Sequence, residues 1–433
     1  MSDPAATAHR APVRGWCPGA LKPMETGDGL IVRVRAHCGT LSAEQMLDIC
    51  EIAERHGNGH IDLTRRANVQ IRGIRVEGLP EVWSMLSALG LIDLNAEAES
   101  VRNVMINPLA GLDPTEVSDV RPIVLALETA LSQASDLWSL PAKFGFSVDG
   151  GGVLPLDGER ADVRLRAVRD GARPAIAIGA DRTDGVAWLG IVAPDAAVDA
   201  VTALLRASLA ATENTGRTRF RALAPRLVQD LKLALAPYGA AISENVLAPP
   251  QQSCGSVLGP IMVNGTVVGA GIGAPFGRLE AASMRDLLAA AQSLGLDEFR
   301  LSPWRALVVP ATRMRDVEIL LARARECGFI ADPDDPLTLI DACPGAPACS
   351  SARLDVRAAA YRLAQLLPLP GVSSVHVSGC AKGCARSKAA DLMLVDCGTV
   401  FGVARHGRAE APPVAYVEPD NLERLRLMLE AGI

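Results

Sequence analysis

Two short loops near the C-terminal end, DACPGAPAC at residues 341–349 and SGCAKGCAR at residues 378–386, carry two cysteine pairs. The spacing is C-x5-C in the first loop and C-x3-C in the second. Glycine and proline surround both pairs, which is typical of loops whose backbone passes close to a compact group. In an intracellular protein, thiolates grouped in this way usually hold a metal or an iron–sulfur cluster. The candidate ligands are Cys343, Cys349, Cys380 and Cys384.

The spacing of the cysteines favours a cluster over a single ion. Structural zinc prefers two to four residues between paired cysteines, so the second pair would suit zinc and the first would not. A cluster is wider, and four unevenly spaced thiolates can reach its corners. Lys382, Arg386 and Lys388 add positive charge beside the second pair, which is expected to lower the pKa of the thiols and to offset an anionic cluster. A zinc ion, or a set of buried or disulfide-bonded cysteines, remains the alternative.

Composition sets the broad class of the protein. The 433 residues allow about three domains. The formal charge of 43 − 49 = −6 argues against general nucleic-acid binding. Residues 1–13 predict a disordered tail without the apolar segment of a signal peptide, and no apolar run is long enough for a membrane span. We therefore expect a cytoplasmic protein with no nucleic-acid partner and no membrane segment.

The chain contains an internal repeat. When the sequence is shifted by 238 residues, nine identities fall within 28 positions without a gap, from Ala36 opposite Ala274 to Leu63 opposite Leu301. Two copies suggest a pseudo-twofold arrangement with a site between the halves. The proline-rich segment 243–256 is the expected linker between them.

The apolar periodicity predicts an α+β fold with mostly antiparallel strands. Strands are expected at residues 29–36, 61–63, 68–74, 144–148, 161–168, 174–180, 186–192 and 299–309. Helices are expected after the capping box Ser42–Gln45 and at residues 79–89, 118–133, 281–294, 315–327 and 352–367. The glycine-rich stretch 267–275 looks like a dinucleotide fingerprint, but the repeat aligns it with the strand at 31–35, so we expect no nucleotide site there.

Basic and amide side chains gather in segments of the first half. They are Arg65, Arg66, Asn68, Gln70, Arg72, Arg102, Asn103 and Lys143, and Arg305 stands in the second half. Such groups suit a ligand with several carboxylates, because arginine binds carboxylates in a bidentate manner. The alternative is that they are solvated surface charges or form internal salt bridges.

The cysteine pairs, the repeat and three further motifs together resemble the sulfite/nitrite reductase superfamily over about residues 15–433. The motifs are T-x-R-x3-Q at 64–70, R-N-x4-P-L-A-G at 102–111 and L-P-x-K-F at 140–144. The resemblance implies a duplicated fold with two ferredoxin-like half-units and two α/β units around a tetrapyrrole. The units would be a tail at 1–13, half-unit 1 at 14–95, a tetrapyrrole-binding unit at 96–242, a linker at 243–256, half-unit 2 at 257–335 and a [4Fe-4S]-binding unit at 336–433.

The resemblance also implies roles for single residues. The four paired cysteines would hold a [4Fe-4S] cluster, and the position of Cys384 bridges to the haem iron in siroheme reductases. Arg66, Arg102 and Lys143 match catalytic positions that bind the anionic substrate of the reductases. The expected substrate-binding set is Arg65, Asn68, Gln70, Arg72, Asn103, Arg305 and Lys382.

One departure from the reductases moves the expected substrate. The reductases carry a second lysine where this chain has Gly145, and losing a positive group weakens the case for oxyanion reduction. The phrases at residues 14–24, 140–152 and 300–307 resemble the precorrin-3B synthase branch, which acts in aerobic cobalamin biosynthesis. That branch implies an O2-dependent monooxygenase that hydroxylates precorrin-3A at C20 and forms a γ-lactone.

The same branch implies further cofactors and partners. A mononuclear non-haem iron is expected beside the cluster, but the six histidines show no ligand spacing. Electrons would come from a separate reductase or a ferredoxin-like protein, and ultimately from NAD(P)H. The alternatives are a siroheme-dependent sulfite or nitrite reductase, in which siroheme is the cofactor, and a non-enzymatic cluster-bearing tetrapyrrole carrier.

Overall fold

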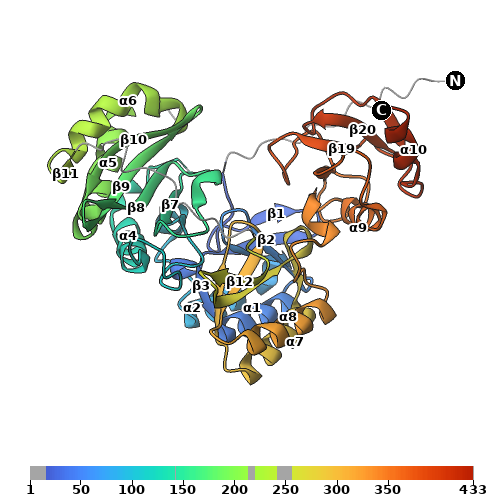
Figure 1. The fold of residues 1–433 in the computed structure, drawn as a ribbon, viewed down its shortest axis with the longest axis horizontal. Coiled ribbons are helices and arrows are strands. Elements are labelled where there is room, and N and C mark those ends of the chain that lie inside the picture. Colours follow the sequence, from blue (N-terminus) through green and yellow to red (C-terminus); the bar gives the residue numbers. More distant parts are fainter. Residues whose placement is uncertain (1–15, 142, 213–219, 241–255, 433) are drawn as a thin grey trace.

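The computed structural model describes residues 16–141, 143–212, 220–240 and 256–432. A central body lies below two wings in Figure 1. The expected tail and most of the linker at 243–256 fall outside the described residues.

The central body contains two five-stranded antiparallel sheets. One sheet has the order β1-β2-β5-β4-β14, with β1 Met24–Thr26, β2 Gly29–Val34, β5 Val69–Ile74, β4 His60–Leu63 and β14 Arg278–Glu280. The other has the order β12-β13-β16-β15-β3, with β12 Gly259–Val263, β13 Thr266–Gly273, β16 Ala306–Pro310, β15 Glu298–Leu301 and β3 Thr40–Ser42. Each sheet therefore receives one edge strand from the other half of the chain.

The structure confirms the repeat. Helix α1 spans Ala43–Arg55 and α7 spans Ala281–Ser293, an offset of 281 − 43 = 238 that also relates β3 to β14 and β4 to β15. The backbone repeats too, because Cys38 and Phe276 both have positive φ, as do Ala67 and Arg305. The expected capping box of Ser42 and Gln45 opens α1.

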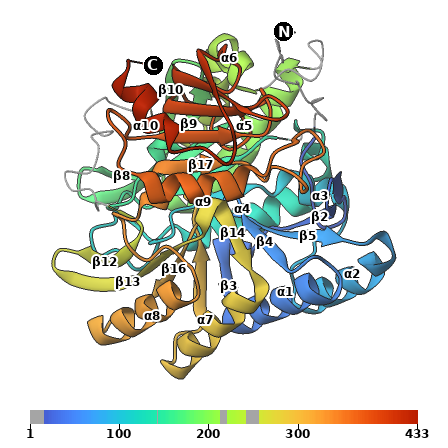
Figure 2. The same cartoon turned by 90° about the vertical axis from the view of Figure 1, so that its right-hand side faces the viewer.

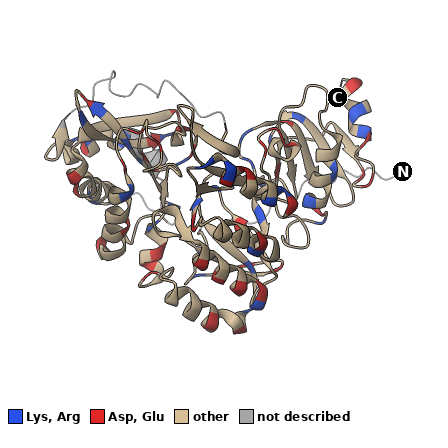
Figure 3. Cartoon of the chain, turned by 60° about the horizontal axis from the view of Figure 1, so that its bottom comes forward, with Lys and Arg blue, Asp and Glu red and all other residues tan. Residues whose placement is uncertain are grey.

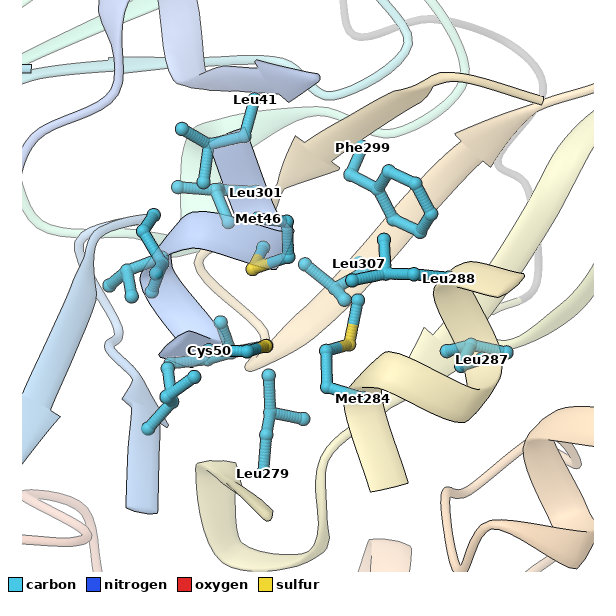
Figure 4. Packing of buried hydrophobic residues seen from close by; sticks show 14 of the residues in the cluster. Leu41, Met46, Cys50, Leu279, Met284, Leu287, Leu288, Phe299, Leu301 and Leu307 are labelled. Atoms are coloured by element: carbon cyan, nitrogen blue, oxygen red, sulfur yellow. The ribbon is translucent and has the colours of Figure 1, made fainter. Parts of the chain in front are cut away.

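The shared core lies between the two halves. Met46 and Cys50 of α1 pack in one cluster with Leu279, Met284 and Leu288 of the second half (Figure 4). Helices α2 Leu79–Ala88 and α8 Met314–Glu326 complete this layer, which lies on the side of the sheets away from the wings (Figure 2). Burying one continuous apolar interface makes the two halves a single body.

The first wing is built on a six-stranded sheet of order β11-β10-β9-β8-β7-β6. Its strands are β6 Val104–Ile106, β7 Phe146–Asp149, β8 Val163–Asp170, β9 Arg173–Arg182, β10 Gly185–Val192 and β11 Gly239–Ala240. Its helices are α3 Ala96–Val101, α4 Arg121–Gln133, α5 Ala197–Thr212 and α6 Phe220–Leu235.

The second wing carries both cysteine loops on a sheet of order β17-β18-β19-β20-β21. Its strands are β17 Ile340–Ala342, β18 Val375–Ser378, β19 Ala390–Asp396, β20 Phe401–Gly407 and β21 Ala415–Val417, and its helices are α9 Val356–Leu366 and α10 Arg424–Glu430. Strands β17, β18 and β19 are parallel neighbours, and the other strand pairs of this sheet are antiparallel. In the first wing, β6, β7 and β8 are likewise parallel neighbours. The duplication thus extends to the wings.

Two sequence expectations need correction or completion. The strand expected at 299–309 is two strands, β15 and β16, because the turn at 302–305 contains Arg305 with φ +59°. The helices α5 and α6 and the strands after the second cysteine loop were not anticipated. The glycine-rich stretch is strand β13, as the repeat predicted.

Candidate functional site

A row of polar side chains crosses the first-half sheet on four neighbouring strands. Arg33 pairs in register with Gln70, Gln70 with Asp62, and Asp62 with Arg278. The repeat-related row in the other sheet is Gly271, Val308, Arg300 and Thr40. The two halves share a backbone, but only the first presents arginine and amide groups across its whole width.

The first wing covers the second-half sheet with apolar side chains. Leu109, Val153 and Leu154 of the wing form one buried cluster with Ile261 and Val308 of the sheet. Such a dry contact has a structural role. The polar row of the first half is therefore the better candidate for a ligand site.

The second wing places the first cysteine loop against the first-half sheet. Arg72 is 2% exposed and donates to the carbonyl of Ala348 at 3.2 Å, one residue before Cys349. Its guanidinium also binds both oxygens of Asp28, at 2.7 and 3.0 Å, and Asp62 at 3.2 Å. We expected Arg72 to bind substrate, but its donors are occupied by these partners, so the structure assigns it to anchoring the loop.

The loops around the four cysteines are shaped for a thiolate-bound group. The amide of Gly379 donates to the Sγ of Cys343 at 3.1 Å, and a Cβ on Gly379 would lie 2.6 Å from that of Ala352. Burial raises the pKa of the Cys343 thiol to about 11, and the nearby Cys384 and Cys349 thiolates raise it further. The side chain of Cys384 is exposed, but the protein groups around its thiol still desolvate it and raise its pKa, although Lys382 acts in the opposite direction. The expected effect of a basic residue on the thiol pKa is thus present for Lys382, but burial outweighs it.

Unpaired polar atoms beside these loops fit a missing anionic partner. Arg357 of α9 has its Nε and Nη1 buried without a hydrogen-bond partner, and the Cys343 thiolate acts on its charge. His376 of β18 is 0% exposed, both its nitrogens are unpaired, and its Cε1 lies 3.4 Å from the Cβ position of Gly383. Since buried polar groups normally have partners, these residues fit a cluster held by the cysteines.

The described residues do not fit a single metal ion in the same way. Across residues 16–141, 143–212, 220–240 and 256–432, no three His, Cys, Asp or Glu side chains gather closely enough to hold one. The expected mononuclear iron therefore has no ligand set in the described part of the chain.

Asp341 gathers three arginines between the two halves and the second wing. Its carboxylate binds Arg65 at 2.9 Å, Arg305 at 3.3 Å and Arg386 at 3.0 Å. Arg65 and Arg305 come from the repeat-related turns after β4 and β15. One carboxylate among three guanidiniums leaves positive charge available for further anions.

A cavity of about 370 Å³ opens beside this arginine group. It is lined by Leu154 of the first wing, Trp304 and Arg305 of the central body, and Ile340 and Asp341 of the second wing. The cavity thus lies where all three parts meet. Lys and Arg positions are elsewhere interspersed with Asp and Glu along the outer helices (Figure 3).

A second basic group connects the central body to the first wing. Arg66 donates to the carbonyl of Lys143 at 3.1 Å, and Asn103 donates to the carbonyl of Phe144 at 3.0 Å. A Cβ on Gly145 would lie 2.7 Å from Arg66 Nη1 and 2.9 Å from Asn103 Nδ2. The structure therefore brings Arg66, Asn103 and Lys143 together and shows that the missing side chain at 145 leaves room for Arg66.

Arg102 is held in a buried ion pair, whereas we expected it to bind the anionic substrate. It is 2% exposed, binds Asp93 through two hydrogen bonds of 2.7 and 2.9 Å, and donates to the carbonyl of Arg35. A guanidinium in such a buried pair serves the fold, as in the salt-bridge alternative weighed from the sequence. We therefore do not place Arg102 among the groups available to substrate.

The remaining expected residues lie in three settings. Gln70 accepts two hydrogen bonds from Arg33, at 2.6 and 3.1 Å. Asn68 is buried with its Nδ2 unpaired, and Lys382 is exposed beside Cys384.

Arg33 is the residue that the sequence interpretation missed. Burial lowers the pKa of Arg33 to about 10, and the Cys17 thiolate opposes this effect.

Gly145→Ala should lower turnover several-fold without loss of fold. The new methyl would displace the guanidinium of Arg66, which is a flexible end, so the stability cost should stay within about 1 kcal/mol. Steady-state kinetics and thermal unfolding of the purified variant test this. Unchanged kinetics would show that the position of Arg66 does not matter for turnover.

Known proteins give the family of the chain. The nitrite/sulfite reductase ferredoxin-like half domain matches residues 22–89, and the nitrite and sulphite reductase 4Fe-4S domain matches residues 97–230. A precorrin-3B synthase from Sinorhizobium sp is 34% identical over 419 residues, which cover 94% of this chain and 86% of the relative. The chain belongs to the precorrin-3B synthase branch of the sulfite/nitrite reductase superfamily.

Other relatives are oxidoreductases of the same superfamily. The ferredoxin–nitrite reductase of Synechococcus elongatus is 26% identical, with 91% of this chain and 80% of the relative covered. The Mycobacterium tuberculosis NirA protein has the same fold, with a TM-score of 0.72 and 20% identity over 93% of this chain and 80% of that chain. The 4Fe-4S domain match covers the first wing, which has no cysteine, whereas the cysteine pairs stand in the repeat-related second wing.

The described helices include no membrane-spanning candidate, since none is both long and apolar enough.

Proposed function

We propose that the chain is a precorrin-3B synthase that hydroxylates precorrin-3A at C20 with O2 and closes the ring-A acetate into a γ-lactone. One oxygen atom enters the macrocycle, and the other leaves as water after uptake of two electrons and two protons. The observation that carries this proposal is the polar row on the first-half sheet, where arginines outnumber carboxylates. This polar face lies directly beside the cysteine loops.

The residues divide into two groups in this proposal. Five basic residues would bind substrate carboxylates. Arg33 stands in the polar row, Arg65 and Arg305 bind Asp341 beside the cavity, and Arg66 and Lys143 meet at the contact with the first wing. Cys343, Cys349, Cys380 and Cys384 would hold the [4Fe-4S] cluster. When bound, the cluster supplies electrons one at a time, which O2 chemistry requires.

The electrons would reach the cluster from a separate protein. The glycine-rich stretch that looked like a nucleotide site is strand β13, so it offers no NAD(P)H loop. A reductase or ferredoxin-like donor, ultimately supplied by NAD(P)H, is therefore part of the proposal. The mononuclear iron is left out, because the described residues offer no ligand set for it.

Metal analysis and anaerobic reconstitution test the proposal. Purified protein should contain four irons and four sulfides per chain and no siroheme absorption. After precorrin-3A binds without air, adding O2 and a reductant should give a product with one more oxygen atom. Stoichiometric siroheme would instead favour a sulfite or nitrite reductase, and tight binding without product would favour a carrier. An iron count above four would point to a further iron site.

Arg66→Ala should reduce kcat/KM about tenfold to a hundredfold while the cluster stays loaded. A hydrogen bond to a charged group is worth about 1.5–3 kcal/mol, and Arg66 stands between the polar face and the first wing. Kinetics together with the cluster absorption test this. Arg55→Ala is the control, because Arg55 forms exposed pairs with Glu51 and Glu81 far from the site. Unchanged kinetics for Arg66→Ala would remove this residue from the substrate site.

A further inference from the structure

Two groups of arginines, each centred on one aspartate, flank the first cysteine loop. Asp341 binds the three arginines described above. Asp62 lies 3.2 Å from Arg72, 2.8 Å from Arg278 and 3.6 Å from Arg357. Arginines outnumber carboxylates in both groups.

Arg357 is the least satisfied member of these groups. Its side chain is 12% exposed, and its Nη2 makes only a 3.5 Å hydrogen bond to the carbonyl of Phe276. Its Nε and Nη1 have no hydrogen-bond partner at all. Burial lowers the pKa of Arg357 to about 10, and Asp62 and the Cys343 thiolate oppose that effect. A buried guanidinium held so loosely is costly unless further negative charge lies beside it.

Arg305 has a similar relation to Cys343. It is 18% exposed, donates to the carbonyl of Ala385 at 3.2 Å, and has φ +59°. Burial lowers its pKa as well, and the Cys343 thiolate is again among the charges that oppose this. Arg357 lines one pocket with Pro344 and Ala348 of the first cysteine loop. Arg305 binds the carbonyl of the residue after Cys384 in the second loop. The two arginines therefore bring positive charge against both cysteine loops.

We propose that Arg357, together with Arg305, sets the reduction potential of the cluster by stabilising the extra negative charge of its reduced state. One-electron reduction adds one negative charge to the cluster and its thiolates. Nearby fixed positive charge stabilises the reduced form more than the oxidised form and therefore raises the potential. This inference rests on the cluster assignment of the proposed function, but not on the identity of the substrate. Arg357 acts through the cluster and is a positioning residue, whereas Arg305 has this role in addition to the substrate contact proposed above.

An EPR-monitored redox titration of the full-length, cluster-loaded protein tests the proposal. Arg357→Gln should disfavour reduction at least about tenfold, which is a shift of about 59 mV to more negative potential. Arg357→Lys keeps the charge and should remain closer to the unchanged protein. Arg362→Gln is the control, because Arg362 lies on the same helix but is 45% exposed and binds Asp420. Its potential should not move.

Asp62→Asn should shift the reduction potential in the opposite direction, and this variant tests the proposal if the Arg357→Gln protein does not retain the cluster. Removing the carboxylate leaves its arginines less compensated, so the potential should become more positive. An unchanged potential in Arg357→Gln, or a shift of Asp62→Asn to more negative values, would overturn the proposal. A protein that shows these shifts but does not oxidise precorrin-3A would sink the proposed function and leave this inference standing. A protein that binds no cluster would refute both the proposed function and this inference.

Discussion

Cys384→Ser is expected to abolish the [4Fe-4S] cluster or leave only a small fraction of it. The four cysteines supply the only thiolates in the two loops, and a serine oxygen is a poor ligand for a soft iron–sulfur core. Cys384 is exposed, whereas Cys343 and Cys380 are buried, so its loss should remove a ligand without creating a core cavity. Iron and sulfide per chain should fall well below four, and turnover should fall to background.

The matched control is Cys397→Ser in the same wing. Cys397 follows strand β19, outside both loops, and is only partly buried. It should keep full iron, sulfide and activity. Thermal unfolding of both variants separates loss of the cluster from loss of the fold. A Cys384→Ser protein with four irons and full activity would refute the ligand assignment.

The duplication could be predicted because the two copies still share sequence identities at a constant offset. Helix α1 and its copy α7 keep the same apolar spacing, and the identities from Ala36 to Leu63 align without a gap. Strand exchange between the halves could not be predicted in the same way. Nothing in the short segment Thr40–Ser42 indicates that it pairs with β15 rather than with its own half.

The fate of single arginines was the least predictable part of the site. Arg72 and Arg102 stand in motifs that resemble ligand-binding segments, yet both are buried in ion pairs. The motifs themselves do not indicate the deciding carboxylates: Asp28 is 72 − 28 = 44 residues before Arg72, and Asp93, 102 − 93 = 9 residues before Arg102, lies outside the motif of Arg102. Arg33 was missed for the opposite reason, since a charged residue between Val32 and Val34 is also typical of a solvated strand face.

The asymmetry of the two halves gives the site its physical logic. The two related faces differ: one packs on the first wing through an apolar cluster and the buried Arg300, and the other carries Arg33, Gln70 and Asp62 in one row. The apolar face stabilises the first wing on the body. The polar face remains available for a charged ligand beside the cysteine loops, so stability and binding are divided between the copies.

Arg72→Leu is expected to destabilise the protein by about 3–5 kcal/mol, because it leaves buried carboxylates without their partner. Asp28 would lose both hydrogen bonds to the guanidinium, and the carbonyl of Ala348 would lose its donor. Since Ala348 precedes Cys349, the cluster should also become easier to remove with a chelator. Urea unfolding and the rate of iron release measure the two effects.

Two further variants separate a structural role of Arg72 from a role in binding. In Arg72→Leu with Asp28→Leu, the uncompensated carboxylate of Asp28 is gone, so part of the lost stability should return. Arg55→Ala, which breaks only exposed pairs, should change the free energy of unfolding by less than about 1 kcal/mol. If Arg72→Leu instead unfolds like the unchanged protein and only its tetrapyrrole affinity falls, Arg72 belongs to the substrate site after all. The anchoring role follows from four hydrogen bonds to Asp28, Asp62 and Ala348, and these interactions have to be replaced before the guanidinium can reach a ligand.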